Sequence, residues 1–205
     1  MEKYILTPKL RNSYDGSIKP RRDISDILTS KLLFEKINYP MYNSQLTEFP
    51  DINNKVIDAV EPNSVIYFQY PFYITSDFQT DLIRKAHMKQ CAVIAIVHDI
   101  NSLRGLHETL EKDIELLNQF DVITLPSKLA REVLTNAGLK VPVVIQKDPF
   151  DFLTNTPMNY PTFSHTVNYA GNISFTKAGF LGNIKDVYMH IFGSNLDFTL
   201  PKNLE

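Results

Sequence analysis

Apolar residues in this chain form two alternating patterns, short β-branched runs and longer segments with helical spacing. In residues 21–33, for example, Ile24, Ile27 and Leu28 share one face of a helix. The strand-like runs are residues 3–7, 36–39, 65–68, 91–97, 122–125 and 143–145. The segments with helical character are residues 21–33, 51–60, 76–89, 106–117 and 127–138.

This alternation predicts an α/β fold. Residues 91–97 are apolar at every position, which is typical of a strand buried on both faces of a parallel sheet. Strands that alternate with helices of about 10–15 residues are connected by right-handed crossovers. We therefore expect a Rossmann-like, doubly wound parallel sheet that extends through about residue 150.

Capping residues mark several helix ends. Ser76 or Asp77 is expected to begin the helix at 76–89. Ser127 is expected to cap the last helix of this domain, and Gly138 stands where a left-handed residue usually follows a helix.

The chain is expected to divide into three parts. Residues 1–150 are expected to form the α/β domain. Residues 147–164 contain three prolines and no periodicity, so we place a linker at 151–165. Residues 166–205 are expected to begin a second β-α-β unit, and they are too few to complete a second α/β domain.

The composition is that of a soluble globular protein, with 43% hydrophobic and 21% charged residues among 205. A net charge of −2 argues against duplex nucleic acid, because neutralising phosphates requires a basic surface. No apolar run approaches the roughly 18 residues of a membrane helix, and no secretory signal is visible. We therefore expect no membrane span and a cytoplasmic protein. The single cysteine, Cys91, excludes a disulfide framework and a multi-cysteine zinc site.

Four common catalytic motifs are absent from the sequence. They are G-x-G-x-x-G, the Walker A loop, the G-x-S-x-G elbow and H-E-x-x-H. Their absence argues against a standard dinucleotide dehydrogenase, a P-loop NTPase, an α/β-hydrolase and a zincin.

Polar residues that follow the apolar runs are the first candidates for a site, because ligands of open α/β sheets bind at the carboxyl ends of the strands. These residues are Asn12, Ser13, Gln69, His98, Asp99 and Ser127. Tyr70 and Phe72 follow the third run, where their rings would contact an acceptor sugar; alternatively, Tyr67 and Phe68 are core residues and Pro71 only turns the chain.

The pair His98-Asp99 carries the most specific chemistry, because a charge directly after an apolar strand is costly to bury without partners. Asp99 is suited to act as a general base toward an acceptor hydroxyl, with His98 orienting it or binding a sugar oxygen. Alternatively, Asp99 caps the following turn and His98 bonds to the backbone. Arg104 would pair with Asp99 or with an anionic substrate, or it would lie at a surface helix start.

Two further segments have anion-binding potential. The run Lys19-Pro20-Arg21-Arg22 is either a solvated first helical turn or an anion site. Gly171, Asn172 and Lys177 lie between a strand and a helix, where backbone N–H groups and one cation can hold a diphosphate. A plain strand-to-helix turn is the alternative for this loop.

Several segments occur in an order that resembles a known family. They are residues 65–72, 96–104, 117–123, 126–127, 138 and 169–172, with residues 12–16 fitting more loosely. This set resembles bacterial glycosyltransferases of the galactofuranosyltransferase or nucleotide-sugar-synthetase-like family. That family includes glucosyltransferases that extend glycans on serine-rich adhesins of streptococci and lactobacilli. The resemblance covers essentially the whole chain.

The resemblance implies a GT-B architecture, in which an N-terminal domain holds the acceptor and a C-terminal domain binds a UDP-sugar without a metal ion. His98 and Asp99 would then serve catalysis. The acceptor side would include Asn12, Ser13, Gln69, Tyr70 and Arg104. The nucleotide-sugar side would begin with Gly171, Asn172 and Lys177.

The function implied is transfer of a hexose, glucose or galactofuranose, from a UDP-sugar to a carbohydrate or glycoprotein acceptor. Family members are much longer, so we expect an incomplete chain that is inactive alone. Its uncovered cleft face would favour homo-oligomers. The alternative is a non-catalytic α/β module for partner binding or oligomerisation, in which Asp99→Asn would have little effect.

Overall fold

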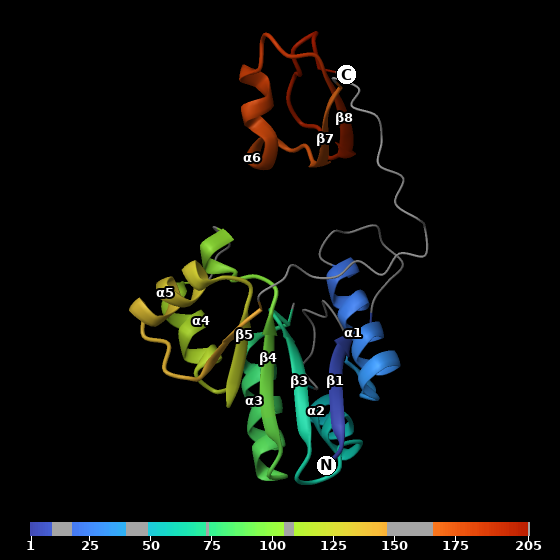
Figure 1. Ribbon diagram of the computed structural model, residues 1–205, viewed down its shortest axis with the longest axis vertical. Helices are drawn as coiled ribbons and strands as arrows, with labels where there is room; N and C mark the ends of the chain where they lie inside the picture. Colours follow the sequence, from blue (N-terminus) through green and yellow to red (C-terminus); the bar gives the residue numbers. More distant parts are fainter. Residues whose placement is uncertain (10–17, 40–48, 73, 105–108, 147–165, 205) are drawn as a thin grey trace. The chain divides into compact units, whose positions relative to one another are not determined.

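The computed structural model describes residues 1–9, 18–39, 49–72, 74–104, 109–146 and 166–204, which form two compact units (Figure 1). The larger unit is Met1–Leu153 and the smaller unit is Thr154–Glu205. The linker expected at 151–165 and the helix start expected at 106 lie outside the described residues.

Six parallel strands form the sheet in the described part of the larger unit. They are β1 (Lys3–Pro8), β2 (Glu35–Tyr39), β3 (Val65–Tyr70), β4 (Ala92–Val97), β5 (Val122–Leu125) and β6 (Val143–Ile145). The helices between them are α1 (Ile18–Leu32), α2 (Phe49–Asp58), α3 (Ser76–Met88), α4 (Leu110–Leu117) and α5 (Lys128–Asn136), with a 3-10 turn η1 (Ser102–Arg104) before α4. The predicted α/β fold with a parallel sheet is confirmed. None of the helices described is long and apolar enough to cross a membrane.

The strands lie in the order β2-β1-β3-β4-β5-β6. From β1 the chain moves outward to β2 and then crosses back to β3, so the topological switch point lies between β1 and β3. Because crossovers are right-handed, this reversal puts α1 on one face of the sheet and the following helices on the other. Ile24 and Leu28 of α1 pack with Ile5 and Phe34, whereas the other helices contribute to the larger core on the opposite face (Figure 1).

Strand β4 is covered unevenly on its two faces. Val93, Ala95 and Val97 are buried in the larger core. On the face of α1, Ile96 is buried but Ala92 is exposed. The expectation that this whole run is buried on both faces is therefore wrong at its beginning, because α1 packs over β1 and β2 rather than over β4.

Side-chain caps define the helix starts. Ser127 Oγ accepts the backbone N–H three residues on at 3.1 Å, and Gly138 follows α5 with φ of +104°, as the sequence predicts. Helix α3 differs, because its cap is Thr75 rather than Ser76 or Asp77. Thr75 has an extended backbone, and its hydroxyl accepts the N–H three residues on at 3.4 Å.

The smaller unit contains a parallel pair of strands, β7 (Val167–Asn172) and β8 (Met189–Ser194), connected through α6 (Phe175–Ala178) and η2 (Gly179–Asn183). Its core includes Ile173, Ala178, Leu181 and Leu204. This arrangement places Gly171 and Asn172 at the carboxyl end of β7.

Candidate functional site

The carboxyl ends of β1, β3 and β4 lie beside the switch point, and each end carries a polar residue. Thr7 lies near the end of β1, Gln69 lies near the end of β3, and His98 directly follows β4. Asn12 and Ser13, which the sequence assigns to the same edge, lie outside the described residues. The switch point is where open α/β sheets bind their ligands, so these ends define the candidate site.

Gln69 connects the three strand ends through a buried hydrogen-bond network. Its side chain is 0% exposed, and its Nε2 donates to Ser25 Oγ at 2.9 Å and to Thr7 Oγ1 at 3.3 Å. Its Oε1 lies 2.9 Å from His98 Nε2. The hydroxyl oxygens of Thr7 and Ser25 are 2.6 Å apart. The network therefore ties α1 to the ends of β1, β3 and β4.

The directions of these hydrogen bonds define the state of His98. Ser25 Oγ donates its hydrogen to the carbonyl of Arg21 at 2.9 Å, so it accepts from the amide nitrogen of Gln69. The amide oxygen of Gln69 then faces His98, whose Nε2 must donate. The network thus places a hydrogen on Nε2 of His98.

Arg21 places a buried positive charge beside this network. Its side chain is 1% exposed, and its Nη1 donates to the carbonyl oxygen of Gln69 at 2.8 Å. Burial, together with the charge of Arg21, lowers the pKa of His98 to about 3. His98 is therefore neutral near pH 7 and acts there as a hydrogen-bonding group rather than as a titrating base.

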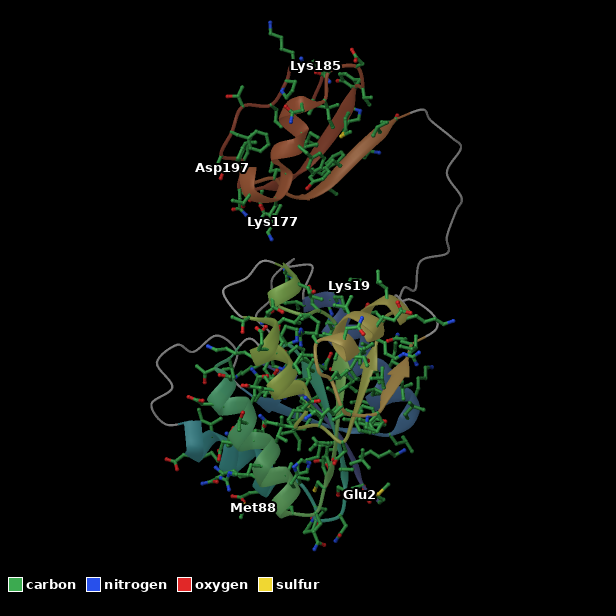
Figure 2. The ribbon with its side chains drawn as sticks, turned by 90° about the vertical axis from the view of Figure 1, so that its left-hand side faces the viewer. Glu2, Lys19, Met88, Lys177, Lys185 and Asp197 are labelled. Atoms are coloured by element: carbon green, nitrogen blue, oxygen red, sulfur yellow. The ribbon has the colours of Figure 1, made fainter. Side chains whose placement is uncertain are left out.

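The basic run at the start of α1 is not a uniformly solvated turn. Arg22 is exposed, and Lys19 forms an ion pair with the buried Asp23. Arg21 instead bonds into the network, so the solvated interpretation is wrong for this residue. Lys19 lies at the opposite end of the larger unit from Glu2, which places the start of α1 at the carboxyl edge of the sheet (Figure 2).

Asp99 presents a carboxylate to solvent at the same edge. Its Oδ1 accepts the N–H of Ile100 at 2.9 Å, and its Oδ2 lies 3.0 Å from Arg104 Nε. The side chains of Asp99 and Arg104 are 43% and 36% exposed, so a ligand can reach both. The pairing with Arg104 is one of the alternatives that the sequence offers. Both carboxylate oxygens keep lone pairs for a further donor, such as a ligand hydroxyl.

A second buried polar cluster surrounds Asp113 of α4, on the other face of the sheet. Asp113 is 2% exposed, and its Oδ1 accepts the hydroxyl hydrogen of Tyr70. Its Oδ2 accepts from the N–H of Ser102 at 3.0 Å and from its hydroxyl at 2.6 Å. Sequence reasoning missed this residue, although its spacing from Leu110 and Leu117 places it on the apolar face of the helix. A carboxylate on such a face indicates a buried, hydrogen-bonded group.

Three residues that the sequence offers as acceptor contacts lie inside the protein. Gln69, Tyr70 and Phe72 are all at most 1% exposed. The first two bond to protein groups, and Phe72 packs against Phe68 and Tyr39. Their expected role is therefore corrected: they support the site from beneath and present no side chain to an acceptor.

The predicted anion-binding loop in the smaller unit is a strand-to-helix turn. Asn172 Oδ1 accepts the N–H of Ser174 at 2.9 Å within the turn itself. Lys177 is exposed and lines a pocket of about 650 Å³ together with Phe175 and Phe198. Diphosphate binding by this loop stays a prediction.

The structure thus gathers part of the predicted set at one edge of the larger unit. His98, Asp99 and Arg104 lie there with the buried Gln69 beneath them. The candidates Gly171, Asn172 and Lys177 belong to the smaller unit. Across the described ranges, no group of three or more His, Cys, Asp or Glu residues is placed to hold a metal ion.

Comparisons with known proteins agree with this architecture. Residues 2–147 match the family described as Glucosyltransferase 3-like, N-terminal domain. Glucosyltransferase 3 of Streptococcus gordonii is 23% identical over 151 residues, which are 71% of this chain and 45% of that protein. Glucosyltransferase 3 of Streptococcus parasanguinis is 22% identical over 144 residues, 68% of this chain and 44% of that protein. The chain therefore spans about half the length of the curated relatives it matches.

A solved structure shares the fold. The crystal structure of Anabaena HepE in complex with UDP and glucose matches with a TM-score of 0.59 and 13% sequence identity. The match covers 93% of this chain and 60% of HepE. At this identity the likeness is one of fold.

Proposed function

This chain belongs to the family of glucosyltransferase 3-like proteins, of which it contains the N-terminal domain, and from that premise we propose that it is the acceptor-binding part of a hexosyltransferase. The donor is a UDP-sugar that carries glucose or galactofuranose, and the acceptor is a carbohydrate or a glycoprotein. The names of the streptococcal relatives, and the UDP and glucose bound to HepE, support this proposal. In a GT-B arrangement, the larger unit is the acceptor side and the smaller unit begins the donor side.

The observation that carries the proposal is the carboxylate of Asp99 at the carboxyl end of β4. It lies next to the switch point, it is partly exposed, and both of its oxygens are oriented by neighbouring donors. A carboxylate held in this way is suited to accept the hydrogen of a sugar hydroxyl during nucleophilic attack.

In the reaction we propose, an acceptor hydroxyl oxygen forms a bond to the anomeric carbon of the donor sugar. The bond between that carbon and the diphosphate oxygen breaks, and UDP leaves with the electron pair. The hydroxyl proton passes to Asp99. His98 stays neutral and is bonded to Gln69 at the beginning of the loop formed by residues 98–104. Arg104 orients Asp99 or binds a polar group of the acceptor.

On the donor side, we propose that Gly171, Asn172 and Lys177 face the diphosphate. The exposed ammonium group of Lys177 supplies a positive charge beside a pocket in the smaller unit. The N–H groups of Ser174 and Phe175 already donate to Asn172 Oδ1 and Asp197 Oδ1, so the proposal relies on the charge of Lys177 and requires no metal ion.

Acceptor binding tests the proposal directly. The ¹⁵N-labelled 205-residue chain is titrated with methyl glycosides of glucose, galactose and N-acetylglucosamine, and the backbone amide shifts are followed by NMR. We expect a saturable shift of the amides of residues 98–104. Asp99→Asn should weaken this binding by about tenfold, because a hydrogen bond to a charged group is lost.

The matched control is Asp77→Asn, which removes an exposed aspartate in the first turn of α3. This variant should bind the glycosides like the unmodified chain. Glycoside shifts that are equal in both variants, or that leave residues 98–104 unmoved, would contradict the proposal.

A further inference from the structure

Asp99 and Arg104 lie on a loop, residues 98–104, that is attached at two points to adjacent residues of one strand. Gln69 and Tyr70 are consecutive on β3, so their side chains point to opposite faces of the sheet. Gln69 bonds to His98 at the beginning of the loop, at 2.9 Å. Tyr70 is connected to Ser102, farther along the loop, through the carboxylate of Asp113.

The second attachment fixes the turn that carries Arg104. Asp113 accepts both the N–H and the hydroxyl hydrogen of Ser102, the first residue of η1. Arg104 is the last residue of the same turn, and its backbone N–H donates to the carbonyl of Asn101 at 3.1 Å. The position of the Arg104 backbone therefore depends on where Asp113 holds Ser102.

The burial of Asp113 indicates that it serves this loop rather than its own helix. An apolar residue at its position would extend the inward face that Leu110, Ile114 and Leu117 already form. A carboxylate there is unfavourable unless hydrogen bonds compensate for its desolvation. Its donors are a phenol, a backbone amide and a hydroxyl, and two of the three belong to the loop.

We propose that Asp113 is a positioning residue that holds Arg104 in register with Asp99 and so preorganises the carboxylate for the acceptor hydroxyl. The meaning for catalysis rests on the proposed function, whereas the positioning itself does not. Asp99 Oδ1 accepts a hydrogen bond from Ile100, and Asp99 Oδ2 forms an ion pair with Arg104. With Asp113 in place, these bonds fix the carboxylate before any ligand arrives.

The side-chain Nε–H of Arg104 reports this positioning, since it faces Asp99 Oδ2 at 3.0 Å. In the 205-residue chain labelled with ¹⁵N-arginine, the exchange of this hydrogen with water is measured by NMR. Asp113→Ala should speed the exchange by about threefold, the size expected when a partly exposed ion pair is lost. Asp113→Asn keeps an oxygen for Ser102 and should retain most of the protection.

The matched control is Asp81→Ala on α3. Asp81 likewise has three donors, but these are the side chains of Asn53, Arg84 and Lys85, away from the loop. This substitution should destabilise the protein and leave the exchange at Arg104 unchanged. Equal exchange rates in Asp113→Ala and the unmodified chain, or equal acceleration in Asp81→Ala, would overturn the proposal.

Ser102→Ala is a second variant that tests the same proposal if Asp113→Ala does not fold. It removes one donor to Asp113 and leaves α4 intact, so exchange at Arg104 should still accelerate, and an unchanged rate would overturn the proposal. If Asp113→Ala speeds the exchange at Arg104 but the unmodified chain binds no glycoside, the proposed function alone is refuted. If the unmodified chain binds glycosides but Asp113→Ala leaves the exchange rate at Arg104 unchanged, the positioning role alone is refuted.

Discussion

At the scale of single residues, two neighbours in the sequence have different hydrogen-bond and charge partners. His98 is held inside by Gln69 and lies close to the buried charge of Arg21, which together with burial keeps it neutral. Asp99 is partly exposed and pairs with Arg104. Both side chains are half-buried at the end of β4, where the chain leaves the sheet. A hydrogen-bonding ring and a partly exposed carboxylate therefore lie side by side.

The lowered pKa of His98 makes the protein less stable on acidification. The folded pKa is about 3, below the ordinary value of 6.5. Above pH 6.5 the ring is neutral in both the folded and unfolded states. Below it, the unfolded chain binds a proton that the folded chain does not, so the free energy of unfolding falls, by about 1 kcal/mol between pH 7 and 5.5. This loss continues until the pH approaches the folded pKa.

Urea unfolding at pH 7 and pH 5.5 measures the effect. His98→Gln removes the titrating ring and keeps an N–H for Gln69, so the difference between the two pH values should shrink by about 1 kcal/mol. His87→Gln, on an exposed surface of α3, serves as the control. If His98→Gln kept the full pH dependence, the assignment of a buried neutral ring would be incorrect.

The sequence allows part of this site to be predicted. His98 and Asp99 are recognisable because they directly follow an apolar strand, and the pairing with Arg104 needs only five residues of chain. The burial of Arg21 was not predicted, because the sequence of the basic run does not distinguish its solvated residues from the buried one. Asp113 was predictable in principle, from a carboxylate on an apolar helix face, but its partners come from distant segments.

At the scale of elements, the alternation of strands and helices was predictable because each period is a local property of the chain. The strand order was not, since the crossing from β2 back to β3 depends on packing between elements far apart in sequence. That order creates the switch point and thereby decides which strand ends meet. Helix boundaries also shifted, by three residues at the start of α1, and the cap of α3 is Thr75 rather than either of its two neighbours.

The cap of α3 gives a prediction at this scale. Thr75→Ala should lower the free energy of unfolding by about 1 kcal/mol, because the N–H of Phe78 loses its acceptor. Ser76→Ala lies inside the first turn and should change it by less than about 0.5 kcal/mol. Chemical denaturation of both variants compares them, and a larger loss in Ser76→Ala would contradict the observed cap.

At the scale of the whole molecule, the chain combines a six-stranded sheet in its described larger unit with a smaller unit built on a parallel strand pair. The family match covers residues 2–147, within the larger unit, and the streptococcal relatives are about twice as long as the matched region. We therefore propose the acceptor side for the larger unit and the donor side for residues of the smaller one.

We propose above all that the larger unit supplies the acceptor site of a hexosyltransferase, in which Asp99 accepts the proton of the acceptor hydroxyl. The most direct test is a chimera in which residues 1–153 replace the matching region of Streptococcus gordonii Glucosyltransferase 3. Transfer of glucose from UDP-glucose to an acceptor glycoside is then measured. We predict transfer by the chimera, a loss of about 100-fold or more with Asp99→Asn, and little change with Asp77→Asn. A folded chimera that binds UDP but transfers no glucose, or one in which Asp99→Asn keeps full turnover, would contradict the account.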